Sequence, residues 1–167
     1  IYRFLIDGGI HEESAAVLKG IYDRGWPMIQ LGAVVTTVFS YAMIPYLSKA
    51  KVRGNKEVVN ELIKQSIKVC LVFGSAATVG LIVVMPHLNV MLFTDNNGID
   101  ALILLCLAVI FGALFMTAAA LLHGIGRAKL AAYFLFFGLV LKGIGNRFLV
   151  PHFQITGAAL STVMSLL

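Results

Sequence analysis

The sequence predicts an all-α integral membrane protein, a helical bundle that crosses a bilayer several times. Three observations predict this class. Only 13% of the residues are charged and 59% are hydrophobic, whereas about 25% are charged in a typical soluble domain. The mean hydropathy is +0.92. Residues 25–48 form an uncharged, mostly apolar run, and a helix that spans a bilayer needs about 20 such residues.

The apolar runs predict four complete spans and the start of a fifth. A helix is the expected structure for each run, because lipid offers no partner for an unsatisfied backbone group. Residues 1–24 are expected to form an extracytoplasmic connection and the start of the first membrane helix. The chain starts at Ile1 and stops at Leu167 inside an apolar run, so we expect a fragment of a longer protein. The predicted spans are 25–48, 69–93, 99–122, 130–150 and, truncated, 155–167.

The charges of the connecting loops predict the orientation. Residues 49–68 carry six basic and two acidic residues, and residues 94–100 carry two Asp and no basic residue. The next loop carries Arg127 and Lys129. Basic loops stay in the cytoplasm, so the first and third loops are expected there. This bias explains the net charge of +5 without nucleic acid as a partner.

Residues 55–68 place Val, Leu and Ile at helical spacing opposite polar residues. This pattern predicts an amphipathic helix on the cytoplasmic surface, which then turns into the membrane. A solvated linker is the alternative.

The first span carries a stripe of small residues at Gly32, Thr36 and Ser40, which share one helix face. Small residues allow helices to approach closely, and hydroxyl groups can hydrogen-bond between helices. The stripe therefore predicts helix packing or, alternatively, the lining of a polar cavity.

Lys142 is the clearest charge inside a predicted span. It lies about 18 Å along the fourth helix, past the middle of the membrane, and Asn146 follows one turn later on the same face. Charges at this depth are costly and are usually functional. Between their ends, the spans contain no Asp or Glu to pair with it. Lys142 is therefore expected to bind a carboxylate elsewhere in the protein, bind an anionic ligand, or snorkel outward.

Arg24 precedes the first span and is the best candidate for substrate binding. A guanidinium group suits bidentate binding of phosphate oxygens, and Asp23 is expected to neutralise and orient it. A surface arginine at a helix start is the alternative.

A series of motifs extends along nearly all of the chain. They are Gly20–Arg24, Pro27, Ile44–Ser48, Gly54–Asn55, Met85–Phe93, His123–Gly126, Lys142 with Asn146, Leu149–Pro151 and Gly157–Ala159. Their order resembles the carboxy-terminal lobe of bacterial lipid II flippases. These belong to the cell-wall and sporulation branch of the multidrug/oligosaccharidyl-lipid/polysaccharide exporter superfamily.

This resemblance implies a protein of the bacterial plasma membrane with two helical lobes around a cavity, here lacking its amino-terminal lobe. It would move an undecaprenyl diphosphate sugar, such as lipid II, by alternating access. The resemblance gives Arg24 the role of the family's cavity arginine. Some members bind sodium at positions that match Lys142, Asn146 and Thr162. An ammonium group at Lys142 would stand where the metal ion binds, so we expect no metal and no sodium coupling here.

Other classes of protein are less consistent with the sequence. A drug or cation antiporter of the same superfamily would favour carboxylates within the spans. A membrane-embedded enzyme would need a cluster of carboxylate or His side chains, but His87, His123 and His152 are dispersed. A structural subunit would need no lysine inside the membrane. We expect no catalytic residues and no cofactor.

Overall fold

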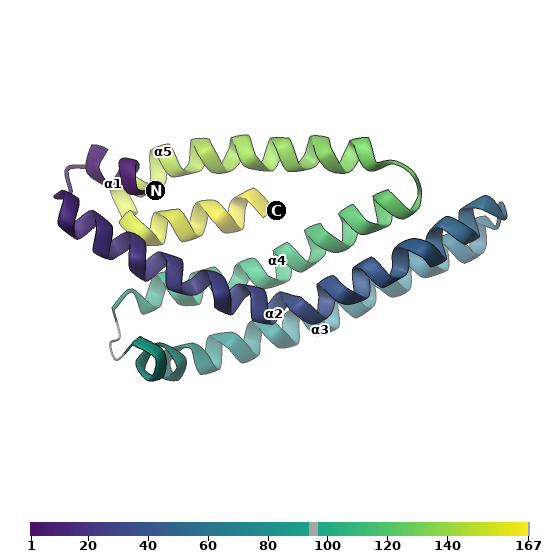
Figure 1. The fold of residues 1–167 in the computed structure, drawn as a ribbon, viewed down its shortest axis with the longest axis horizontal. Coiled ribbons are helices and arrows are strands. Elements are labelled where there is room, and N and C mark those ends of the chain that lie inside the picture. The colour runs from purple at the N-terminus through teal and green to yellow at the C-terminus, as the bar shows by residue number, and fades with distance from the viewer. Residues whose placement is uncertain (94–96, 167) are drawn as a thin grey trace.

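The computed structural model describes residues 1–93 and 97–166, and every regular element in these residues is an α-helix. The predicted all-α class is therefore confirmed. The predicted loop residues Thr94 and Asp95, and Leu167 of the fifth span, lie outside the described residues. In chain order the helices are α1 (Tyr2–Asp7), α2 (Glu12–Val52), α3 (Lys56–Phe93), α4 (Ile99–Gly124) and α5 (Ala128–Leu166) (Figure 1).

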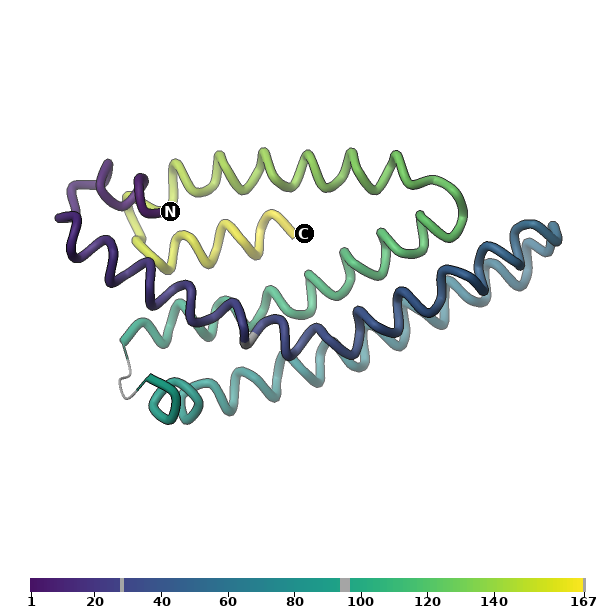
Figure 2. The backbone as a smooth tube through the Cα atoms, viewed as in Figure 1, coloured from purple at the N-terminus to yellow at the C-terminus, as the bar shows by residue number. Residues whose placement is uncertain are grey.

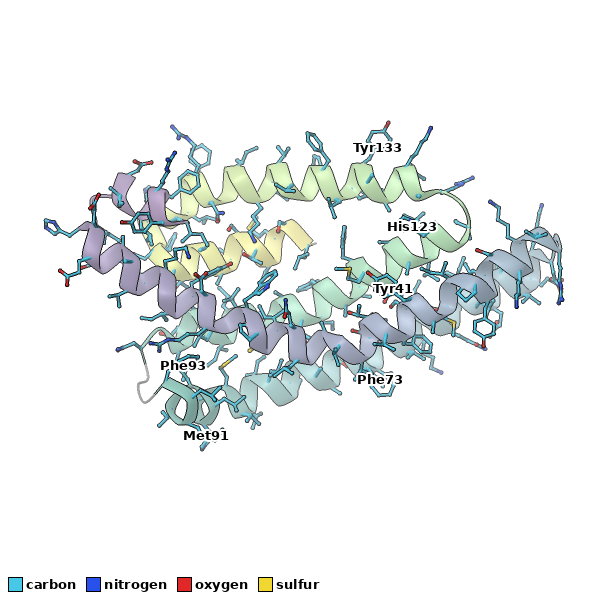
Figure 3. The ribbon with its side chains drawn as sticks, in the orientation of Figure 1. Tyr41, Phe73, Met91, Phe93, His123 and Tyr133 are labelled. Atoms are coloured by element: carbon cyan, nitrogen blue, oxygen red, sulfur yellow. The ribbon has the colours of Figure 1, made fainter. Side chains whose placement is uncertain are left out.

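Among the described residues, four helices, α2 to α5, are long and apolar enough to cross a membrane. In the most apolar stretch of α4, 44% of the residues are buried, against 6 to 17% in the other three helices. α4 packs against α2, α3 and α5 and is the centre of the bundle. The other helices present large apolar side chains outward, and Tyr133 on α5 points away from the bundle (Figure 3). Such a surface needs lipid or protein to cover it, as in a multi-pass membrane protein.

Helix α2 extends beyond the predicted span 25–48 at both ends. It contains 41 residues, which makes it about 60 Å long, twice the thickness of the hydrocarbon core. It begins at Glu12 and continues through Pro27 and Pro45 as one helix. Residues 12–24 therefore belong to the same helix as the first span, and the connection before it is limited to α1 and a short turn.

Helix α3 is also longer than its predicted span. The turn before it contains Gly54, which has a φ of +70°. The side chain of Asn55 accepts a hydrogen bond of 3.1 Å from the backbone N–H of Val58 and caps the helix. Residues 56–68 then form the first turns of α3, with no break before the span. The predicted amphipathic segment is thus part of a hairpin with α2, which extends past the α4–α5 turn (Figure 1).

Helix α5 consists of two arms. Gln154 has non-helical backbone angles, with φ 51° and ψ −129°. The chain reverses there, so that the second arm, 155–166, runs back beside the first arm, 128–153 (Figure 2). Gly157 allows the closest approach, because a Cβ atom there would lie 2.6 Å from the carbonyl carbon of Leu149. The main hydrophobic cluster includes this reversal and joins Val150 and Ile155 to Leu5 of α1.

Ser40 and Thr117 form a buried hydrogen bond of 2.7 Å between α2 and α4. We expect Ser40→Ala and Thr117→Val to show a coupling energy of about 0.6 kcal/mol in a double-mutant cycle, because interhelical hydrogen bonds in membranes contribute about this much. Unfolding of the complete protein in mixed detergent micelles measures it. Ser75→Ala, at an exposed site whose hydroxyl bonds within its own helix, is the control. Additive effects of the two replacements would contradict this role.

Candidate functional site

Arg24 lies well inside α2 and not at a helix start. It is twelve residues after Glu12, or about 18 Å along the helix axis. Its side chain is half-buried. The guanidinium carbon lies 4.5 Å from the centre of the Phe93 ring, which is close enough for a cation–π interaction. This contact places the positive charge of the guanidinium group over the π face of the ring.

The bend of α3 helps to place the Phe93 ring. Phe93 is the last residue of α3, and the final turns of this helix leave the line of its earlier part (Figure 2). Pro86 precedes these turns, and a proline inside a helix removes a backbone hydrogen bond and favours a kink. Phe93 lies at this end of the bundle, whereas its neighbour Met91 points outward (Figure 3).

Asp23 forms an ion pair with Lys19, one turn earlier on α2. Both side chains are about half exposed. The sequence predicts that Asp23 orients Arg24, but in the structure its carboxylate is bonded to Lys19. The exposed pair is therefore worth at most about 1 kcal/mol.

Lys142 and Asn146 lie on one face of the first arm of α5, and Lys142 is half-buried whereas Asn146 is buried. The side-chain oxygen of Asn146 accepts a hydrogen bond from the Ser161 hydroxyl of the second arm. The next residue, Thr162, shares a hydrogen bond of 2.8 Å with the hydroxyl group of Tyr22 on α2. The first of these buried hydrogen bonds joins the two arms of α5, and the second joins the second arm to α2 at Tyr22, two residues before Arg24.

The predicted stripe on α2 packs inside the bundle. A Cβ atom at Gly32 would lie 2.6 Å from Leu81 of α3 and 3.1 Å from Val109 of α4. Thr36 and Ser40 are buried at 3% and 2% exposure. The stripe was predicted to serve either helix packing or the lining of a polar cavity. These contacts with α3 and α4 correspond to helix packing.

Sequence reasoning missed Tyr22, Phe93 and Ser161 as partners of the candidate residues. Tyr22 lies beside the predicted Arg24, but its partner Thr162 is far away in the sequence. Among the described residues, no three His, Cys, Asp or Glu side chains are grouped as metal ligands. The three histidines considered for an enzyme lie on three different helices, α3, α4 and α5.

The fold and the site define a polytopic α-helical membrane protein that carries half-buried cationic side chains on two of its long helices. The family follows from comparison with known proteins. Residues 26–167 match the family described as lipid II flippase MurJ. The chain belongs to this family.

Several curated relatives match nearly all of the chain. The uncharacterized membrane protein YabM of Bacillus subtilis is 39% identical over 161 residues, which cover 96% of this chain and 30% of the relative. The lipid II flippase MurJ of the same organism is 26% identical, and the match covers 97% of this chain and 31% of the relative. An uncharacterized membrane protein of Methanocaldococcus jannaschii is also 26% identical, and the match covers 94% of this chain and 34% of the relative. The chain thus spans about a third of the length of these relatives. No solved structure matches it.

Proposed function

We propose that the complete protein containing this chain flips a lipid-linked cell-wall or polysaccharide precursor across the bacterial cytoplasmic membrane. The substrate would be an undecaprenyl diphosphate sugar such as lipid II, moved by alternating access. Membership of the flippase family supports this function, as does the relative named lipid II flippase. The observation that carries the proposal is the half-buried guanidinium of Arg24 stacked on Phe93.

A diphosphate needs a cationic partner when it leaves water. The planar guanidinium group of Arg24 can donate two parallel hydrogen bonds to phosphate oxygens. Its cation–π contact with Phe93 restricts the side chain, so that less conformational entropy is lost on binding. Lys142 adds a second positive charge from α5. In this proposal both residues bind the diphosphate, and Asn146, one turn after Lys142, joins the two arms of α5 through Ser161.

The missing amino-terminal lobe would supply the opposite wall of the cavity. The basic residues at the α2–α3 turn and at the α4–α5 turn would face the cytoplasm. The end of the bundle that carries Arg24 would then lie toward the outer face of the membrane.

Growth rescue tests this function. The complete protein is expected to support growth of a bacterium depleted of its own lipid II flippase, and the precursor is expected to stop accumulating in the inner leaflet. A complete protein that is inserted in the membrane and still gives no rescue would contradict the proposal.

A proton- or cation-coupled drug antiporter of the same superfamily is the alternative. It is less well supported, because residues 25–48, 69–93 and 101–150 of the described chain carry no acidic residue, and Asp100 lies in the first turn of α4. The family comparison also favours a transporter over an enzyme.

We further propose that transport is not coupled to sodium. The side chains of Asn146 and Thr162 are hydrogen-bonded to Ser161 and Tyr22, and Lys142 supplies a fixed positive charge beside them. We expect reconstituted complete protein to transport equally fast in sodium and in potassium buffers. Sodium-dependent transport that Lys142→Ala leaves unchanged would contradict this proposal. Arg147→Ala, at an exposed position of α5, is the control.

A further inference from the structure

A cavity of about 700 Å³ opens at the end of the bundle opposite the α2–α3 turn. Its walls come from three segments that are distant in the sequence. They are the first turns of α2 with Glu13 and Ser14, the residues just before α4 with Asn97, and the reversal of α5 with Gln154 and Ile155. This volume is within the range of small-molecule sites, about 300–1,000 Å³.

The lining of this cavity combines an apolar base with polar groups at its rim. Ile21 and Ile155 are buried at 5% and 6% exposure. The side chains of Glu13, Asn97 and Gln154 are exposed around them. Carboxylate and carboxamide groups accept and donate hydrogen bonds to hydroxyl groups. A sugar ring matches this lining, because it has apolar C–H faces and hydroxyl groups at its edge.

The charge of the cavity disfavours the diphosphate itself. Among the described residues that line it, Glu13 is the single charged one, and its negative charge repels phosphate. The cavity is therefore suited to a neutral or amino sugar. The chemistry of the cavity and that of Arg24 are complementary for a ligand that carries both a saccharide and a diphosphate.

The backbone at Gln154 is strained in the wall of this cavity. Its φ of 51° with ψ of −129° is a conformation that residues other than glycine rarely adopt, at a cost of about 1–3 kcal/mol. A glycine would adopt the same angles at little cost. The glutamine at this position therefore adds strain, and it also adds a carboxamide group to the wall.

The cavity lies beside Arg24. Ile21, which lines it, is three residues before Arg24 on the same helix, a rise of about 4.5 Å. On the other side, Asn97 follows four residues after Phe93, on which Arg24 stacks. The lining of the cavity thus includes residues close in sequence to both Arg24 and Phe93.

We propose that this cavity binds the saccharide attached to the diphosphate of the lipid-linked precursor. The inference rests on the proposed function and adds to it a glycan-binding site on this lobe. Gln154 and Glu13 hydrogen-bond sugar hydroxyl or amino groups, while Arg24 binds the diphosphate. Recognition of the two parts of the substrate is therefore divided between two neighbouring sites.

Binding of two probes to the complete protein in nanodiscs tests this site. One probe is lipid II and the other is undecaprenyl diphosphate, which has no sugar. Gln154→Gly keeps the backbone angles and removes the carboxamide, and Glu13→Ala removes the carboxylate. We expect each variant to bind lipid II about fivefold more weakly, since one hydrogen bond contributes about this factor. We expect undecaprenyl diphosphate to bind as it does to the wild type.

The matched controls are Glu12→Ala and Gln30→Ala, which remove exposed side chains of α2 outside the cavity and should leave both affinities unchanged. If both cavity variants bind lipid II like the wild type, or lose affinity equally for the two probes, the saccharide site is overturned. Arg24→Gln is expected to weaken binding of both probes. If it weakens neither, the proposed function fails, whatever the cavity variants show.

Discussion

Replacing Arg24 by glutamine in the complete protein is expected to abolish growth rescue and to slow translocation of the lipid-linked precursor about 10- to 100-fold. The reason is the loss of charge-assisted hydrogen bonds to phosphate, each worth about 1.5–3 kcal/mol. Glutamine keeps much of the apolar length of the side chain and removes the charge and the planar pair of donors. A translocation assay with purified variants in liposomes measures the effect.

Two further variants separate this role from a structural one. Arg24→Lys keeps the charge but loses the bidentate geometry, so we expect intermediate activity. Arg147→Gln removes an exposed arginine from α5 and should transport like the wild type. Full activity of Arg24→Gln, with normal amounts of protein in the membrane, would show that Arg24 only anchors α2.

Replacing Gly157 by alanine is expected to have the largest effect on stability. The added Cβ atom would overlap the carbonyl oxygen of Leu149 and lie 2.6 Å from its carbon and 3.1 Å from the nitrogen of Val150. These are backbone atoms, so the clash cannot be relieved by a rotamer change. We expect a loss of about 3 kcal/mol or more, the upper part of the range for overpacking. Thermal unfolding of the complete protein in detergent measures it.

Gly143→Ala is the matched control on the same helix. Among the described residues, no atom outside its own helical turn lies within 4 Å of the Cβ position at Gly143, and alanine has the higher helix propensity. We expect the Tm of this variant to be equal to or above that of the wild type. Equal melting temperatures for Gly157→Ala and Gly143→Ala would mean that the close approach of the two arms of α5 is not formed.

Long apolar runs were enough to predict the class of fold. In a bilayer, a run such as 99–122 must satisfy its backbone groups as a helix, and the structure has α4 there. The start of α2 at Glu12 could not be predicted in the same way, because residues 12–23 carry four charged residues among apolar ones and hydropathy does not distinguish a helix from a loop there. The pair of Lys19 and Asp23 has the i,i+4 spacing of a helix, and this spacing was the available signal.

The partners of the candidate residues depend on tertiary structure. Phe93 lies at the end of a different helix from Arg24, and no local pattern connects them. Ser161 reaches Asn146 because the chain reverses at Gln154. The predicted spans 130–150 and 155–167 leave a break at 151–154, but glutamine is not a residue type that signals a positive φ, so the residue that carries the non-helical angles could not be predicted. The residue types of a cationic site were thus recognisable, whereas the groups that hold them were not.

Transport by the purified complete protein tests the central claim most directly. Liposomes would carry fluorescent lipid II in one leaflet, and a membrane-impermeant reagent would report its arrival in the other. We predict that the complete protein accelerates this movement and that Arg24→Gln removes most of the acceleration. A rate equal to that of protein-free liposomes, measured with folded and correctly inserted protein, would contradict the assignment as a flippase.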